Sequence, residues 1–88
     1  TLLSPGMAIR RLVGQNLKRF REAAGLSQEA LAFECGLHRT YVSGVERGVR
    51  NPTVVVLEKL AEPLGVPSWR LLVPPEEPTL PTPGSEAF

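Results

Sequence analysis

Hydrophobic residues recur at helical spacing along the first part of the chain. In the first segment the apolar positions lie three or four residues apart and share one helix face: Ile9, Val13, Leu17, Phe20 and Ala24. Gly25 follows as a stop. A second, shorter segment begins after Ser27, whose hydroxyl can cap the first amides of a helix, and it ends at Gly36. The pattern predicts two consecutive helices.

The third segment starts near His38 and carries Val42 and Val45 three residues apart, with Gly48 as its stop. This apolar pair marks the buried side of a helix. Gly36 stands at the very short turn before it, where a residue that tolerates positive φ is needed. The remaining residues of the segment are predicted to lie largely on its open side: Arg39, Thr40, Ser43, Gly44 and Arg47.

The fourth segment, residues 53–64, carries conflicting signals. Three consecutive valines favour a strand by propensity, but the apolar positions follow helical spacing, and Pro52 and Thr53 form a helix start. We therefore predict a helix, which Pro63 should kink or end about a turn early because proline lacks an amide donor. A last short helix, capped by Ser68, is predicted to carry Trp69, Leu71 and Leu72.

Proline and glycine residues separate two tails from the helical part. Residues 1–7 show no hydrophobic periodicity and are predicted to be a flexible N-terminal arm or a remnant of cloning. Residues 74–88 hold five prolines in fifteen positions, which prevents a regular helix, so we predict a disordered tail. The folded domain is accordingly predicted to span residues 8–73.

Length and charge limit the function classes. A chain of 88 residues forms one small domain with little stability to spare, so a partner subunit is plausible. Residues 1–50 hold eight Arg or Lys against four Glu, and residues 51–88 hold two against five. A basic half suggests a nucleic-acid surface, although ordinary solvated helix faces explain the charge as well.

The sequence lacks the ingredients of several other functions. Cys35 is the only cysteine and His38 the only histidine, so we predict no disulfide, metal site or cofactor. No nucleophile–base pair, acid cluster or phosphate-cradling glycine loop supports catalysis, so we predict that the protein is not an enzyme. No apolar run approaches the roughly 18 residues of a membrane span, and no signal peptide is recognisable. A cytoplasmic protein without a membrane partner is expected.

The spacing of small and apolar residues resembles the helix-turn-helix of the Cro and phage-repressor family, also called the Xre family. The stretches "GLSQEALA", "YVSGVERG", "NPTVVVLEKLA" and "LGV" resemble that family in order and separation, over about residues 8–73. Counted from Gln28 as the first position, the fifth, ninth, fifteenth and eighteenth positions are Ala32, Gly36, Val42 and Val45. The resemblance implies an all-α, compact five-helix, lambda-repressor-like domain that presents its third helix to the major groove of double-stranded DNA.

This resemblance assigns candidate roles to individual residues. Arg39 and Thr40, with Ser43 one turn on, are candidates for base contacts, because Arg can pair with guanine O6 and N7 and Thr can contact a thymine methyl. Contact of Arg39 with phosphate alone stays open. Gln28 is predicted to clamp a phosphate at a helix start, where amides favour an anion. Further phosphate candidates, each with a solvated or structural alternative, are His38, Tyr41, Arg47 and Arg50.

Gly44 departs from the family pattern, since many relatives carry a long side chain there that reaches a base. We therefore expect fewer direct contacts between side chains and base edges in this protein. The resemblance also implies a structural ion pair between Arg21 and Glu46. If that pair is buried, removing one partner would leave an uncompensated charge.

A homodimer is expected, because one copy contacts too few base pairs to distinguish its site from other DNA sequences. Trp69, Leu71 and Leu72 are predicted to form its interface, with closure of the core as the alternative role. Such a dimer would read a palindromic operator whose half-sites lie one helical turn, about 34 Å, apart. The leading hypothesis is a sequence-specific transcriptional repressor or autoregulator. The alternative is the antitoxin of a toxin–antitoxin pair, which would bind DNA and a toxin protein.

Overall fold

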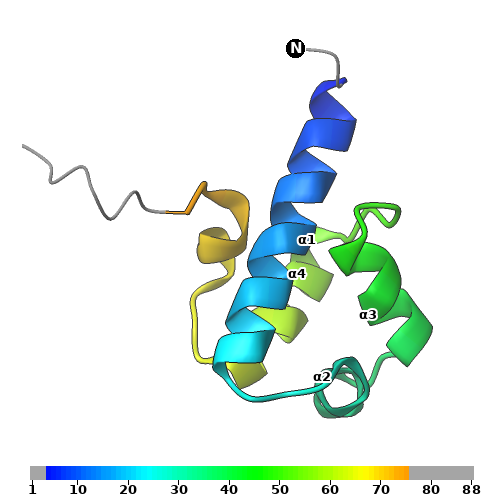
Figure 1. The fold of residues 1–88 in the computed structure, drawn as a ribbon, viewed down its shortest axis with the longest axis vertical. Coiled ribbons are helices and arrows are strands. Elements are labelled where there is room, and N and C mark those ends of the chain that lie inside the picture. The colour runs from blue at the N-terminus through cyan, green and yellow to red at the C-terminus, as the bar shows by residue number, and fades with distance from the viewer. Residues whose placement is uncertain (1–3, 76–88) are drawn as a thin grey trace, which may run out of the picture.

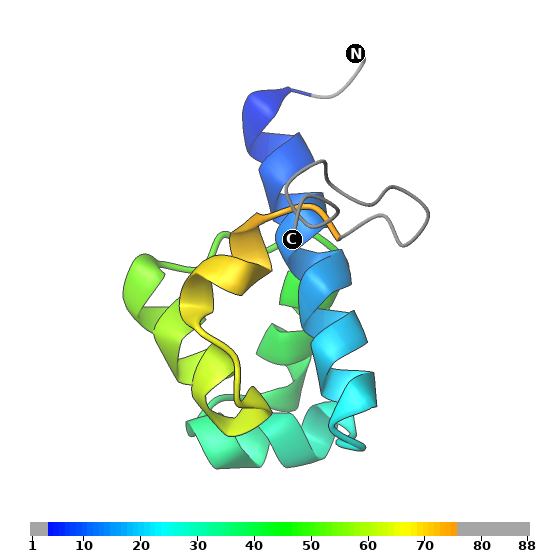
Figure 2. The same ribbon diagram turned by 90° about the vertical axis from the view of Figure 1, so that its left-hand side faces the viewer.

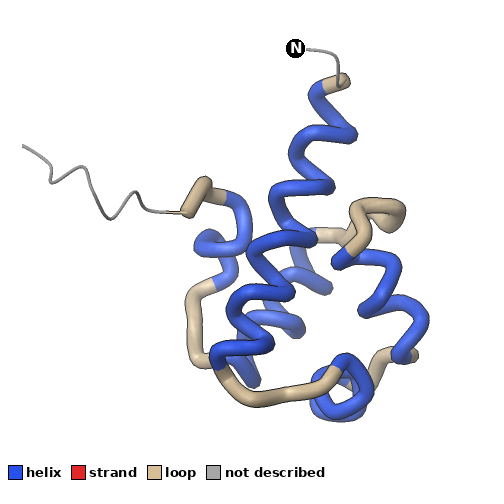
Figure 3. Tube along the Cα trace, in the orientation of Figure 1, coloured by secondary structure: helices blue, strands red, loops and turns tan. Residues whose placement is uncertain are grey.

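The helical pattern of the sequence produces an all-α fold, as predicted. The computed structural model describes residues 4–75, and that part of the chain contains no strand (Figure 3). Its elements, in order, are α1 (Pro5–Ala23), α2 (Gln28–Cys35), α3 (Arg39–Glu46), α4 (Val54–Ala61) and the 3-10 helices η1 (Glu62–Leu64) and η2 (Ser68–Leu72). Most of the predicted Pro-rich tail lies outside the described residues.

α1 begins earlier than the sequence predicted. The hydroxyl of Ser4 accepts a hydrogen bond from the amide of Met7 at 3.2 Å, and Pro5 occupies the first helical position. Proline suits that position because the first amides of a helix have no acceptor within it. Residues 5–7 are therefore helical, and the prediction of a flexible arm is wrong for them.

The predicted turn between α2 and α3 is confirmed. The hydroxyl of Ser27 accepts the amide of Ala30 at 3.0 Å and starts α2. At its other end Gly36 adopts φ +69°, and the amide of Leu37 donates to the carbonyl of Ala32 at 2.9 Å. A side chain at position 36 would strain this backbone, so glycine lets the chain turn directly into α3.

α4 is helical despite its three valines, because the hydroxyl of Thr53 caps its first turn at 3.1 Å. It passes into η1 before Pro63, so the early end predicted from that proline is confirmed. The carbonyl of Lys59, which has no amide donor at position 63, accepts the thiol of Cys35 at 3.2 Å. Burial raises the pKa of the Cys35 thiol and keeps it in this donating form.

The predicted last short helix is present as the 3-10 helix η2, so residues 4–75 contain four α-helices and a 3-10 helix in the place of the fifth. It follows Pro67, and no side chain caps its start. Asn16 on α1 is 1% exposed, and its Nδ2 donates to the carbonyls of Leu71 at 3.0 Å and Val73 at 2.8 Å. These hydrogen bonds hold η2 and the residue that follows it against α1.

α1 lies at the centre of the fold, with α3 packed on one side of it and η2 on the other (Figures 1 and 2). Fully buried side chains from five elements meet there: Leu17, Leu31, Val42, Val45, Leu60 and Leu71. At Gly14 a Cβ atom would overlap the backbone carbonyls of Val45 and Glu46, so only glycine lets the two helices approach this closely. The side of α3 that faces the core therefore packs closely against α1.

Candidate nucleic-acid interface

α3 presents polar side chains on the side that faces away from the core. Val42 and Val45 are at most 1% exposed, whereas Arg39 and Thr40 in the first turn are exposed. Ser43 is half-buried, and its hydroxyl accepts a hydrogen bond from Nε of Arg47 at 3.3 Å. The fold therefore brings the three candidates for base contact onto the outward side of one helix.

Gly44 is buried, which corrects the prediction that it lies on the open side. The side chain of Arg50 covers it, so closely that a Cβ at position 44 would lie 2.6 Å from Cγ of Arg50. The Arg50 guanidinium lies 5.7 Å from the centre of the Tyr41 ring, a cation–π distance. Gly44 thus leaves the space in which a loop arginine packs across α3, and the helical pattern held no signal for this contact.

Gln28 is the first residue of α2 and has a partner inside the protein. Its Nε2 donates to Oε1 of Glu46 at 2.9 Å. An amide nitrogen carries two hydrogens, so one donor remains for an anion, beside the backbone amides of the first turn. This position is compatible with the predicted phosphate clamp while also tying α2 to α3.

The other phosphate candidates lie along α3 and just beyond its ends. His38 precedes the helix and is exposed, and its side chain makes no cap hydrogen bond. His38 thus occupies the N-cap position of α3 without a side-chain hydrogen bond to the helix. Tyr41 is half-buried with its ring against the core, while Arg47 and Arg50 are exposed. The structure thus places the candidates His38, Tyr41, Arg47 and Arg50 around the same helix.

Arg21 and Glu46 form the ion pair that the family resemblance implied. Nε of Arg21 donates to Oε2 of Glu46 at 2.6 Å and Nη2 donates to Oε1 at 3.1 Å, with side chains 9% and 3% exposed. Nη1 of Arg21 donates to the carbonyl of Leu26 at 2.7 Å. The hydrogen bond to Glu46 raises the pKa of Arg21. Together with Gln28, the pair joins α1, α2 and α3 and fixes how α3 is presented.

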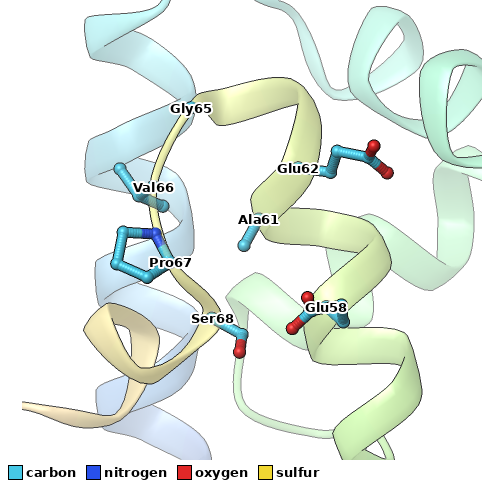
Figure 4. Close-up of a pocket in the computed structure, with 7 residues that line it drawn as sticks. All are labelled: Glu58, Ala61, Glu62, Gly65, Val66, Pro67 and Ser68. Carbon is cyan, nitrogen blue, oxygen red and sulfur yellow. The ribbon is translucent and has the colours of Figure 1, made fainter.

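A cavity of about 440 Å³ lies between the end of α4 and the segment leading to η2 (Figure 4). Its lining includes Glu58, whose carboxylate points toward Ser68, and Glu62. Carboxylates repel phosphate, and no residue of α3 lines this cavity. Within residues 4–75 no three potential metal ligands cluster, and none of the helices there has the length and apolar character to cross a membrane.

The residues predicted to form a dimer interface divide between surface and core. Trp69 is 57% and Leu72 41% exposed, but Leu71 is fully buried. Leu71 packs in the core, so its assignment to the interface is wrong. Leu72 lines a small groove with Ile9 of α1 and Pro52. The exposed apolar surface around Leu72 therefore extends onto α1 and the loop before α4.

Two short helices that are joined at a left-handed glycine, the second of them packed on α1, define a helix-turn-helix protein. The chain belongs to the helix-turn-helix family, whose model matches residues 17–68. A hypothetical transcription factor from Neisseria meningitidis is 48% identical over 69 residues, which make up 78% of this chain. The chain spans 65% of the length of that relative, a little under two thirds.

Solved structures show the same fold. The restriction-modification controller protein C.AhdI from Aeromonas hydrophila is 50% identical, with a TM-score of 0.70 over 73% of this chain and 97% of that one. SinR, the master regulator for biofilm formation, is similar in its complex with DNA. It is 35% identical, with a TM-score of 0.66 over 69% of this chain and 98% of that one.

Proposed function

We propose that this protein is a transcriptional regulator that binds double-stranded DNA in a sequence-specific manner. The observation that carries the proposal is the outward face of α3, where Arg39 and Thr40 project from a helix whose back is buried. The similarity to SinR, solved in complex with DNA, supports it. As a regulator of this family it is not an enzyme, and it acts in the cytoplasm.

In the proposed complex α3 enters the major groove with its first turn toward the base edges. The guanidinium of Arg39 pairs with O6 and N7 of a guanine, a contact that no other base offers in the same pattern. Thr40 contacts a thymine methyl or a base acceptor, and Ser43 lies one turn further along. Contacts to the sugar-phosphate backbone fix the register and come from Gln28, His38, Tyr41, Arg47 and Arg50.

A homodimer reading a palindromic operator completes the proposal. Two copies related by a two-fold axis present two α3 helices, which match half-sites about 34 Å apart. The exposed side chains of Trp69 and Leu72 support an interface at η2. A regulator of this kind acts as a repressor or an autoregulator by occupying the DNA at a promoter.

Selection of genome-derived DNA fragments with the purified protein tests the proposed function. We expect an enriched motif with two-fold symmetry, and binding that weakens steeply as salt rises because counterions are released from the DNA. The absence of any enriched motif, together with weak binding whose affinity does not depend on the DNA sequence, would contradict sequence-specific regulation.

Leu72→Glu is expected to break the homodimer and leave the monomer folded. Leu72 is 41% exposed, so a carboxylate there stays solvated in a monomer but becomes buried and unpaired in a dimer. Sedimentation or size-exclusion mass measurements should show halving of the mass, with an unchanged circular-dichroism spectrum. Gln15→Glu adds the same charge at an exposed position of α1 and should leave the mass unchanged. A Leu72→Glu variant that stays dimeric would place the interface elsewhere.

Gly44→Ala is expected to weaken DNA binding without weakening the fold. The new methyl group would displace the Arg50 side chain, while alanine stabilises a helix interior by about 1 kcal/mol relative to glycine. Binding titrations and melting curves of Gly44→Ala, Arg50→Ala and the double variant test this expectation. Because both changes act through Arg50, the double variant should bind about as well as Arg50→Ala. Fully additive losses would show that Gly44 acts independently of Arg50.

A further inference from the structure

Arg11 on α1 lies against the loop that follows α3. A Cβ atom built on Gly48, which lies two residues beyond the end of α3 and has φ +79°, would lie 3.1 Å from Cγ and 3.4 Å from Cα of Arg11. Gly48 is buried by this contact, whereas Arg11 is exposed. Arg47 and Arg50 stand on either side of Gly48 in the sequence, so α1 adds a third arginine at the C-terminal end of α3.

Nothing among the described residues neutralises this group of arginines. Glu46 is the only acidic residue between positions 36 and 57, and its carboxylate is occupied by Arg21 and Gln28. Within residues 4–75 no ion pair involves Arg11, Arg47 or Arg50. Arg11 and the two arginines that flank Gly48 thus carry positive charges with no acidic partner in the described chain, which favours an anionic ligand.

We propose that Arg11 binds a phosphate of the DNA backbone beside the major groove that α3 enters. This inference rests on the proposed function, because a helix seated in the groove brings its C-terminal end and the following loop close to one strand. The packing of the Arg11 stem on Gly48 places this exposed side chain beside the loop that follows α3. α1 then contributes to affinity through charge, with no preference among bases.

Salt-dependent binding titrations of the full chain on its selected duplex test the proposal. Each phosphate contact contributes about 0.9 to the slope of log K against log salt concentration. Arg11→Ala is expected to reduce the magnitude of that slope by about one. The ratio of affinities for the selected duplex and for one with a substituted base pair should stay unchanged. Arg11→Lys keeps the charge and should keep the slope.

Arg19→Ala is the matched control on the same helix. Arg19 is exposed, but its guanidinium lies 4.6 Å from the Phe20 ring and donates to Oδ1 of Asn16, the residue that holds η2. Its removal should therefore leave the salt slope unchanged. If Arg11→Ala lowers the melting temperature, Arg11→Gln is compared with the wild type in its place. The glutamine keeps a methylene stem over Gly48 and removes the charge.

The outcomes separate this proposal from the proposed function. A folded Arg11→Ala or Arg11→Gln variant with the wild-type slope would overturn the phosphate contact while leaving sequence-specific binding intact. An equal loss of slope in Arg19→Ala would also overturn it, because the effect would then be a general one of charge. Failure of the wild-type protein to select any DNA would instead contradict the proposed function itself.

Discussion

Replacing Glu46 with alanine is expected to lower the free energy of unfolding by about 3–5 kcal/mol. The Glu46 side chain is 3% exposed, and its carboxylate accepts hydrogen bonds from both Nε and Nη2 of Arg21. Its removal therefore leaves the charged Arg21 guanidinium without its partner near the core. The amide of Gln28 loses its acceptor as well. For a domain of this size each kcal/mol corresponds to about 4–8 °C of melting temperature.

Thermal and urea unfolding of Glu46→Ala beside Glu58→Ala measures this effect. Glu58 is an exposed acid on α4 with no ion pair in the described chain, so its removal should change stability by no more than about 0.5 kcal/mol. A double variant that replaces Arg21 and Glu46 with Met and Leu should be less destabilised than Glu46→Ala, because no charge is then stranded. A Glu46→Ala protein that melts near the wild-type temperature would contradict a stabilising role for the pair.

Replacing Arg39 with alanine is expected to weaken binding to the selected operator by about 5- to 150-fold, the equivalent of 1–3 kcal/mol. The preference for guanine at one position of each half-site should relax at the same time, because the bidentate contact is lost. Arg39 is exposed, so the variant should fold and melt like the wild type.

Titrations on duplexes that vary one base pair at a time measure this loss of preference. Arg47→Ala serves as the matched comparison, since the loss of a phosphate contact should weaken binding to all of these duplexes nearly equally. If Arg39→Ala also weakened all of them equally, Arg39 would contact phosphate and base readout would lie elsewhere on α3.

The sequence predicted those elements whose limits depend on one residue and its immediate neighbours. Ser27 and Thr53 cap the helices that follow them, and Gly36 makes the left-handed turn between α2 and α3. These requirements are local, so they can be read from the chain. The ion pair of Arg21 and Glu46 joins residues far apart in sequence, and only the family resemblance implied it.

The features that the sequence analysis missed depend on packing between distant segments. Asn16 reads as a polar surface residue, yet its amide is buried against the carbonyls of η2. Leu71 and Leu72 are alike by residue type, and only the position of η2 on α1 buries the first and exposes the second. The helical pattern predicts that Gly44 is exposed. It gives no indication that Arg50, from the loop after α3, packs over this position.

The most direct test of the central claim is to follow backbone amide chemical shifts of nitrogen-15-labelled protein as the selected duplex is added. We expect the largest changes at Gln28, along Arg39–Glu46 and over residues 47–50, with little change over residues 58–67 around the acidic cavity. Changes concentrated on α4 and around the cavity, with α3 unaffected, would contradict the account, because the outward face of α3 would then not be the surface that meets DNA.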